Sequence, residues 1–91
     1  MFIEVEDWDG NMVLCDVDDD DMRRYYINNE FDGYHHDYNG YLTDQQKKDI
    51  KGFLTWQAKH MEWEDLDKYC EYYREDVERF LYDKLKREVD A

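Results

Sequence analysis

Turn-forming residues are concentrated in the first half of the chain. The 91 residues contain four glycines and no proline, with Gly10, Gly33 and Gly40 in the first half against Gly52 alone in the second. Glycine and proline are the strongest local signals for turns, so the first half must change direction repeatedly, whereas the second is free to form long helices. The sequence therefore predicts a single α+β domain over residues 1–91, with a β- and turn-rich half (1–42) before a helical half (43–91).

The N-terminal residues predict an antiparallel β-hairpin. Residues 2–6 alternate between apolar and acidic side chains, residues 12–17 form a second apolar run, and Asp9-Gly10 lies between them. An Asp-Gly pair between two such runs is a strong hairpin signal, because both central residues of a type I′ turn need a positive φ. We therefore expect strands at 2–6 and 12–17.

Residues 18–42 are consistent with two structures. The acids of the run Asp18 to Asp21 suit the positive end of a short helix that would continue through residues 22–27. Alternatively, Asp-Gly and Asn-Gly turn signals separate three short strands, at 25–27, 34–38 and 41–42. We favour the strands, which would enlarge the hairpin into a small sheet.

Two helices are expected in the second half. Thr43 and Gln46 have the spacing of a capping box, and the apolar residues that follow at steps of three and four predict a helix over 44–60. A second apolar stripe predicts a helix over 63–89. The break near 61–63 follows from length alone, because one helix of about 45 residues is unusual in so small a domain. These patterns select twelve core residues: Ile3, Val5, Val13, Leu14, Ile50, Phe53, Leu54, Leu66, Tyr73, Val77, Phe80 and Leu81.

The chain is strongly and unevenly acidic. It has 25 Asp and Glu against 12 Lys and Arg, a net charge of −13, and residues 1–46 carry −11 of it with Arg23 and Arg24 as their only bases. This charge argues against direct binding to nucleic acid or to anionic lipid, because their phosphate groups would be repelled.

The acids of the second predicted helix, unlike those of residues 1–46, have bases at a suitable distance along the sequence. Three of them precede a base by four residues, which is the spacing of stabilising pairs on a helix: Glu64–Lys68, Glu75–Arg79 and Asp83–Arg87. The acids of the first half have no such partners, and their mutual repulsion costs stability. Such an excess indicates a partner that carries the compensating charge. The alternative is an acidic protein whose charge serves solubility alone.

No pattern for catalysis or for metal binding is complete. Asp16, Asp18 and Asp20 have the spacing of the first ligands of a calcium loop, but Asp21 and Ile27 stand where that loop needs glycine and a bidentate glutamate. The neighbouring His35 and His36 would point to opposite faces of a strand and so would not share one ion. We therefore predict a protein that is not an enzyme and that has neither a cofactor nor a bound metal.

Two further features bear on the compartment. Cys15 and Cys70 lie far apart in the sequence without a CxxC motif, which is typical of free thiols in a reducing environment. No apolar run approaches the length of a membrane span, about 18 residues. We therefore expect a cytoplasmic protein.

Tyrosine is the other residue in excess, with nine copies. Tyrosines build small aromatic cores, and they also supply rigid contact area at interfaces, so the sequence leaves both roles open. Several alternate with acids between residues 25 and 41. The predicted partner-binding residues combine these acids and tyrosines with the Asp run: Asp16, Asp18, Asp19, Asp20, Asp21, Glu30, Asp32, Tyr34, Asp37, Tyr38 and Tyr41.

In size, charge and expected α+β build, the chain resembles the small acidic phage proteins that inhibit host defence, notably anti-CRISPR proteins and DNA mimics. The resemblance implies a viral inhibitor in the cytoplasm of a bacterial host, a monomer or homodimer. Its partner would be a basic nucleic-acid-binding protein such as a CRISPR effector, whose DNA or RNA site it would block. Two alternatives stay open: an immunity protein that neutralises a basic nuclease toxin, and, from another class, a divalent-cation-binding protein built on the Asp run.

Overall fold

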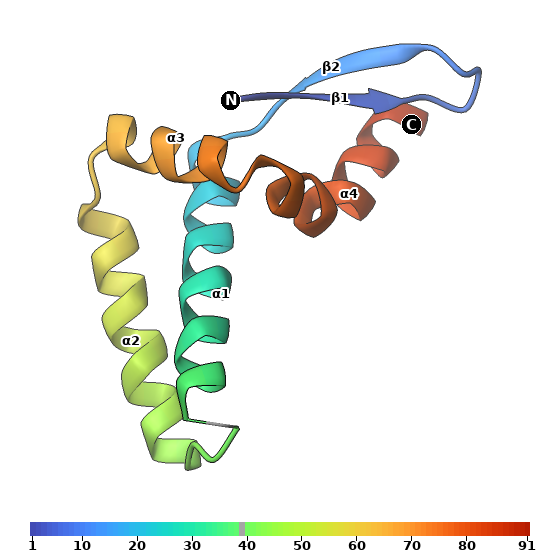
Figure 1. The fold of residues 1–91 in the computed structure, drawn as a ribbon. Coiled ribbons are helices and arrows are strands. Elements are labelled where there is room, and N and C mark those ends of the chain that lie inside the picture. Colours follow the sequence, from blue (N-terminus) through green and yellow to red (C-terminus); the bar gives the residue numbers. More distant parts are fainter. Residues whose placement is uncertain (39) are drawn as a thin grey trace.

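The computed structural model describes residues 1–38 and 40–91 (Figure 1). In this part of the chain two strands precede four helices: β1 (Phe2–Glu6), β2 (Met12–Asp16), α1 (Asp19–Asp37), α2 (Asp44–His60), α3 (Trp63–Tyr72) and α4 (Arg74–Asp90). The α+β class is confirmed, with four helices in place of the expected two. The molecule has the shape of an L, 46 × 27 × 21 Å, in which α1 and α2 form one arm and α3, α4 and the hairpin form the other.

The predicted hairpin is confirmed. The two strands pair antiparallel, with Ile3 opposite Cys15 and Val5 opposite Val13. The turn is wider than the expected type I′ turn, because Asp7 N–H donates to Asn11 O at 2.8 Å and so encloses a loop of three residues. Gly10 adopts a φ of +87° at the end of that loop, a conformation that glycine reaches without strain.

Residues 18–37 form a helix and its cap, so the strands that we expected at 25–27 and 34–38 are wrong. The Asp18 carboxylate accepts the Asp21 N–H at 2.9 Å, as the helical interpretation of this segment predicts, but the helix continues through Gly33 to Asp37. Tyr41 and Leu42 belong to neither a helix nor a strand, and Asn39 of the expected Asn39-Gly40 turn lies outside the described residues.

Helix α2 has the bounds that the sequence predicts. The Thr43 hydroxyl accepts the Gln46 N–H at 3.1 Å, and the Gln46 side chain accepts the Thr43 N–H at 2.9 Å, which completes the capping box. At the other end, the Arg23 guanidinium donates to the backbone carbonyls of Ala58 and Met61. One of the two bases in the acidic half therefore stabilises a helix end.

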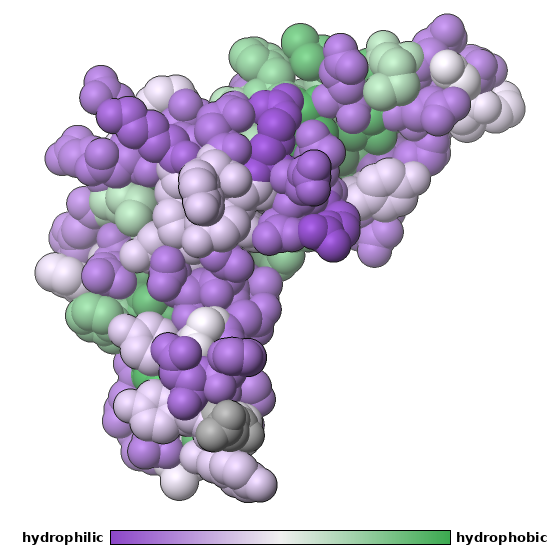
Figure 2. All heavy atoms as spheres, viewed as in Figure 1, coloured by the Kyte–Doolittle hydropathy of each residue, from purple (hydrophilic) through white to green (hydrophobic). Residues whose placement is uncertain are grey.

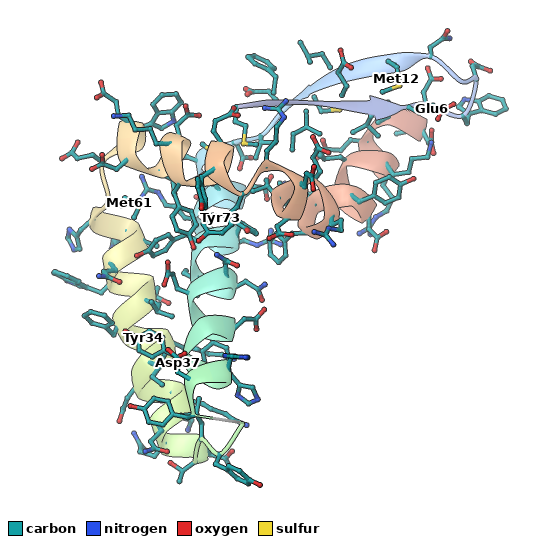
Figure 3. The ribbon with its side chains drawn as sticks, in the orientation of Figure 1. Glu6, Met12, Tyr34, Asp37, Met61 and Tyr73 are labelled. Atoms are coloured by element: carbon teal, nitrogen blue, oxygen red, sulfur yellow. The ribbon has the colours of Figure 1, made fainter. Side chains whose placement is uncertain are left out.

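The single helix expected over 63–89 is broken at Tyr73 into α3 and α4 (Figure 3). Helix α3 packs against α1, whereas α4 packs mainly against β1, and one straight helix would not reach both. The Tyr73 ring lies at the bend, 5.0 Å from Tyr69 and 6.4 Å from Tyr25 between ring centroids. An aromatic cluster therefore fills the corner of the L.

The core lies where the hairpin, the first half of α1, α3 and α4 meet. Half of the predicted core residues are buried: Ile3, Val5, Leu54, Leu66, Val77 and Leu81. Val13, Leu14, Phe53 and Phe80 are wrong as core residues, because they are exposed. Ile50 and Tyr73 are half-buried, and Tyr73 packs against the core. Buried residues outside the twelve predicted ones include Val17, Met22, Tyr25, Tyr26, Cys70 and Leu85.

Candidate interaction surface

The outward face of the hairpin combines acidic and apolar side chains in a regular pattern. Strand residues alternate between faces, and Ile3 and Val5 point into the core, so their neighbours point away from it. Each of the three outward cross-strand pairs joins one apolar residue to one carboxylate: Phe2 with Asp16, Glu4 with Leu14, and Glu6 with Met12. We call these six residues the hairpin face.

All six side chains of the hairpin face are exposed. Hydrophobic groups gather over the hairpin at the top of the molecule (Figure 2), and Glu6 and Met12 stand out near its tip (Figure 3). Trp8 at the tip is 77% exposed. Aromatic and other large apolar groups at the surface, beside carboxylates, are typical of a protein-binding surface.

The hairpin has no basic side chain to offset its acids. Residues 1–18 contain six Asp and Glu and no Lys or Arg. Three cations from outside this acidic stretch or at its end do reach it: the N-terminal nitrogen lies 3.9 Å from an Asp16 carboxylate oxygen, and Arg74 and Lys86 of α4 donate to the backbone carbonyls of Phe2 and Glu6, at 2.6 Å each. Within the described residues, Glu4 and Glu6 form no ion pair. The carboxylates of Glu4 and Glu6 are therefore available to a partner.

The four acids of the Asp run have different roles. Asp18 caps α1, and Asp19 forms an exposed pair with Arg23 at 3.1 Å. Asp20 is exposed, and in the described part of the chain it has no ion-pair partner. Asp21 is only 3% exposed, so it lies in the core rather than at the predicted partner-binding surface.

The buried Asp21 carboxylate links two helices. Lys84 Nζ donates to it at 2.5 Å from α4, and Arg24 lies 3.3 Å away on α1. The hydrogen bond to Asp21 raises the pKa of Lys84 above its ordinary value. This side chain therefore holds α1 to α4.

The other predicted site residues lie along the second half of α1 and just beyond its end. A helix of 19 residues is about 28 Å long at 1.5 Å per residue, so Asp18 and Asp37 mark the two ends of one arm of the L. Glu30, Tyr34 and Asp37 line an open cavity of about 270 Å³ on one side of α1. Glu30 also accepts a hydrogen bond from the Tyr69 hydroxyl at 3.0 Å. The structure thus divides the predicted site into two separate groups.

The tyrosines divide between the two roles that the sequence left open. Tyr25, Tyr26, Tyr69 and Tyr73 form the aromatic cluster at the corner of the L. Tyr34 is half-buried. The remaining four are exposed, namely Tyr38, Tyr41, Tyr72 and Tyr82, and only the first two belong to the predicted partner-binding residues.

Burial favours the protonated forms of a thiol and a phenol in the interior. Burial raises the pKa of the Cys70 thiol to about 11 and that of Tyr25 to about 12. A thiol with so high a pKa is a poor nucleophile. Across residues 1–38 and 40–91, no three His, Cys, Asp or Glu side chains cluster as metal ligands, and Asp16, Asp18 and Asp20 are a strand end, a helix cap and an exposed helix residue.

The acids of α4 do have basic neighbours, although the pairs differ from those predicted. Arg79 pairs with Asp76 instead of the predicted Glu75. Arg87 contacts the predicted Asp83, but it donates to the backbone carbonyl of that residue, at 3.1 Å. Arg74 lies 2.9 Å from Glu71 and 3.5 Å from Glu78. No ion pair between Glu64 and Lys68 is formed in the described structure. The acids of α4 therefore have basic side chains at ion-pair distance, whereas Glu4 and Glu6 of the hairpin have none in the described structure.

Comparison with known proteins gives no relative, because no protein-family model, curated protein or solved structure matches the chain. None of the helices in the described ranges is long and apolar enough to cross a membrane.

Proposed function

We propose that the protein is an acidic inhibitor that binds a basic nucleic-acid-binding protein and occupies its DNA or RNA site. The observation that supports this most is the hairpin face, where three exposed carboxylates alternate with three exposed apolar side chains on a segment without any basic residue. A phage inhibitor of a CRISPR effector is the form of this function that we favour.

The hairpin face suits a surface that binds nucleic acid. The carboxylates of Glu4, Glu6 and Asp16 would pair with the Lys and Arg side chains that otherwise hold phosphates. Phe2 and Leu14 would pack against the aliphatic stems of those side chains and exclude water from the pairs. We therefore centre the contact on the hairpin, with exposed Asp20 beside it and without the buried Asp21.

Long-range attraction would make the association fast. A net charge of −13 raises the rate of encounter with a basic surface, and this steering weakens as salt screens the charges. Apolar anchors act later, because they lengthen the lifetime of the complex once it has formed.

The test begins with affinity capture of bacterial partners on the immobilised protein, followed by binding kinetics with the captured partner at low and moderate salt. The diagnostic variant is Glu4→Gln/Glu6→Gln/Asp16→Asn, which neutralises the hairpin face. Its control is Glu75→Gln/Asp83→Asn/Glu88→Gln, which removes three exposed charges from α4. Both variants change the net charge from −13 to −10.

We expect the hairpin-face variant to associate about tenfold more slowly at low salt, and the α4 variant to change the rate by less than about threefold. Equal effects of the two variants would mean that the hairpin is not the binding surface. A captured nuclease toxin in place of a defence effector would favour the immunity-protein alternative, which uses the same charge complementarity.

A further inference from the structure

Backbone hydrogen bonds show which peptide groups face the two edges of the hairpin. Asp7 N–H donates to Asn11 O and Val17 N–H donates to Met1 O, at 2.8 Å each. In an antiparallel pair, residues bonded in this way alternate with residues whose N–H and C=O point away from the partner strand. With the observed register, the even-numbered residues of both strands therefore present their peptide groups along the two edges.

The edge of β1 is covered by α4. Arg74 donates to the Phe2 carbonyl and Lys86 donates to the Glu6 carbonyl, at 2.6 Å each. Both acceptors are even-numbered residues, in agreement with the pattern of the ladder. Helix α4 packs against β1, and β1 lies between β2 and α4 (Figure 1). This edge is therefore closed to a further strand.

The edge of β2 is open. In residues 1–38 and 40–91, no group hydrogen-bonds to the peptide N–H or C=O of Met12, Leu14 or Asp16. Proteins usually protect such an edge with lysine, proline or a β-bulge. The strand Met12–Asp16 contains neither lysine nor proline, and it pairs with β1 in continuous register, without a bulge. An unprotected edge of this kind is a template for one more strand.

The two faces of β2 select the strand that fits. Val13 and Cys15 lie opposite the buried Val5 and Ile3, so this face of the strand is apolar. The opposite side of β2 belongs to the hairpin face, where Asp16 stands at the end of the strand. An added strand whose side chains alternate between apolar and basic matches both faces, because successive residues of a strand point to opposite sides.

We propose that the edge of β2 binds an extended segment of the partner in which apolar residues alternate with Lys or Arg. Main-chain hydrogen bonds to Met12, Leu14 and Asp16 hold the segment as a third strand. Its apolar side chains extend the inner side of the sheet, and its basic side chains meet the carboxylates of the hairpin face. This proposal rests on the proposed function for the charge of the partner, and it adds the way in which that partner is held.

A second copy of β2 fits this edge less well. Residues 1–18 contain six acids and neither Lys nor Arg. Pairing two hairpins edge to edge brings two such segments together, and their repulsion opposes the added hydrogen bonds. A basic strand places a cation beside Asp16 instead, and opposite charges on neighbouring strands stabilise a sheet.

The test uses a peptide of about seven residues, blocked at both ends, in which lysine and valine alternate. It is added to the ¹⁵N-labelled protein at about 0.15 M salt, and amide hydrogen exchange is followed by NMR. We expect the exchange of Met12, Leu14 and Asp16 N–H to slow about tenfold at a peptide concentration of ten times the measured Kd. Absence of this protection overturns the inference.

A methylated peptide separates strand pairing from attraction by charge alone. The same sequence with N-methyl groups on its central valine and on both neighbouring lysines keeps every charge, but neither of its edges can pair with a strand. We expect it to bind at least about tenfold more weakly, because main-chain hydrogen bonds are lost. Equal binding of the two peptides overturns the inference, and so does equal binding of a peptide in which glutamate replaces lysine.

A substitution in β2 provides the converse test. Leu14→Pro removes an outward N–H that has no partner in the hairpin, so proline is compatible with this position. Leu14→Ala keeps that N–H and is the matched control. We expect Leu14→Pro to weaken peptide binding at least about tenfold and Leu14→Ala to weaken it less. If Leu14→Pro does not fold, the two peptides on the parent protein decide.

Displacement of nucleic acid from the captured partner tests the proposed function separately. If the peptide protects the three amides but the partner keeps its nucleic acid, the site on β2 stands and the proposed function fails. If nucleic acid is displaced but the peptide gives no protection, the function stands and the site on β2 is overturned. Protection that grows with protein concentration without peptide also overturns it, because a second copy then occupies the edge.

Discussion

Lys84 Nζ lies 2.5 Å from the carboxylate of Asp21, and this pair connects α4 to the first turn of α1. Asp21 is almost fully buried, while the Lys84 side chain is 39% exposed. Within a run of four aspartates, Asp21 therefore forms a buried interhelical pair while Asp20, beside it, faces solvent. Neighbouring acids of the same type thus have separate and testable roles.

Asp21→Asn should lower the free energy of unfolding by about 2 kcal/mol, less than the 3–5 kcal/mol of a fully buried pair because Lys84 is partly solvated. Asp20→Asn is the matched control and should change it by no more than about 0.5 kcal/mol. Urea denaturation of both variants measures the difference. Similar values for the two variants would mean that the pair does not support the fold.

Stability should fall on the alkaline side. Burial raises the pKa of Cys70 from 9.0 to about 11, so the folded chain keeps a proton that the unfolded chain loses above about pH 9. The contribution of this group is complete below that pH and decreases as the pH rises to 11, by about 2 kcal/mol at 1.36 kcal/mol for each pKa unit. Tyr25 and Lys84, whose pKa values are also raised, act in the same direction at higher pH.

The loss of stability between pH 8 and pH 11 should therefore be about 2 kcal/mol smaller in Cys70→Ala than in the parent, although the variant is less stable at pH 8. Leu81→Ala, which removes a buried side chain without an ionisable group, is the control and should keep the parental pH dependence. Denaturant titrations under reducing conditions at both pH values provide the comparison. The same pH dependence in Cys70→Ala and the parent would contradict the burial of this thiol.

Truncation of core residues should separate the observed core from the predicted one. Leu81→Ala should lower the free energy of unfolding by about 2–5 kcal/mol, because Leu81 of α4 is buried in the core. Phe53→Ala should cost less than about 1 kcal/mol in dilute solution, since half of that ring is already in water. Thermal or urea unfolding measures the stability of the two variants. A loss of several kcal/mol in Phe53→Ala would contradict the exposure of this ring and support its predicted role in the core.

Added NaCl should raise the melting temperature of the free protein, because salt screens the repulsion among the acids of residues 1–46. The hairpin-face variant, with three fewer of these charges, should respond less than the α4 variant. A melting temperature that falls with salt would show that attractive pairs dominate in this half.

The sequence was sufficient to predict the hairpin and α2, but it left the faces of β2 undetermined. Met12 to Cys15 are all apolar, so no alternation shows which side chains point inward. A two-residue Asp9-Gly10 turn would pair Val5 with Leu14, whereas the observed three-residue loop pairs Val5 with Val13. A shift of one residue reverses the faces of a strand, which is why Leu14 is on the hairpin face rather than in the core. The alternation of residues 2–6 already indicated that Phe2, Glu4 and Glu6 point outward.

For residues 18–42, strands were favoured over the helix that became α1 for a different reason. It packs against α2 on one side and against α3 and α4 on another, so its apolar and aromatic residues do not form a single stripe at helical spacing. Gly33 and the tyrosines then resembled turn and strand signals. The break at Tyr73 has no local signal at all, because it depends on the positions of α1 and β1.

The most direct test of the proposed function is the displacement of labelled nucleic acid from the captured partner, followed by fluorescence anisotropy as the protein is added. We expect stoichiometric displacement by the parent protein and by the α4 variant, and at least about tenfold weaker displacement by the hairpin-face variant. If the protein binds while the nucleic acid stays bound, with no fall in anisotropy, the claim that the acidic hairpin occupies the nucleic-acid site is contradicted.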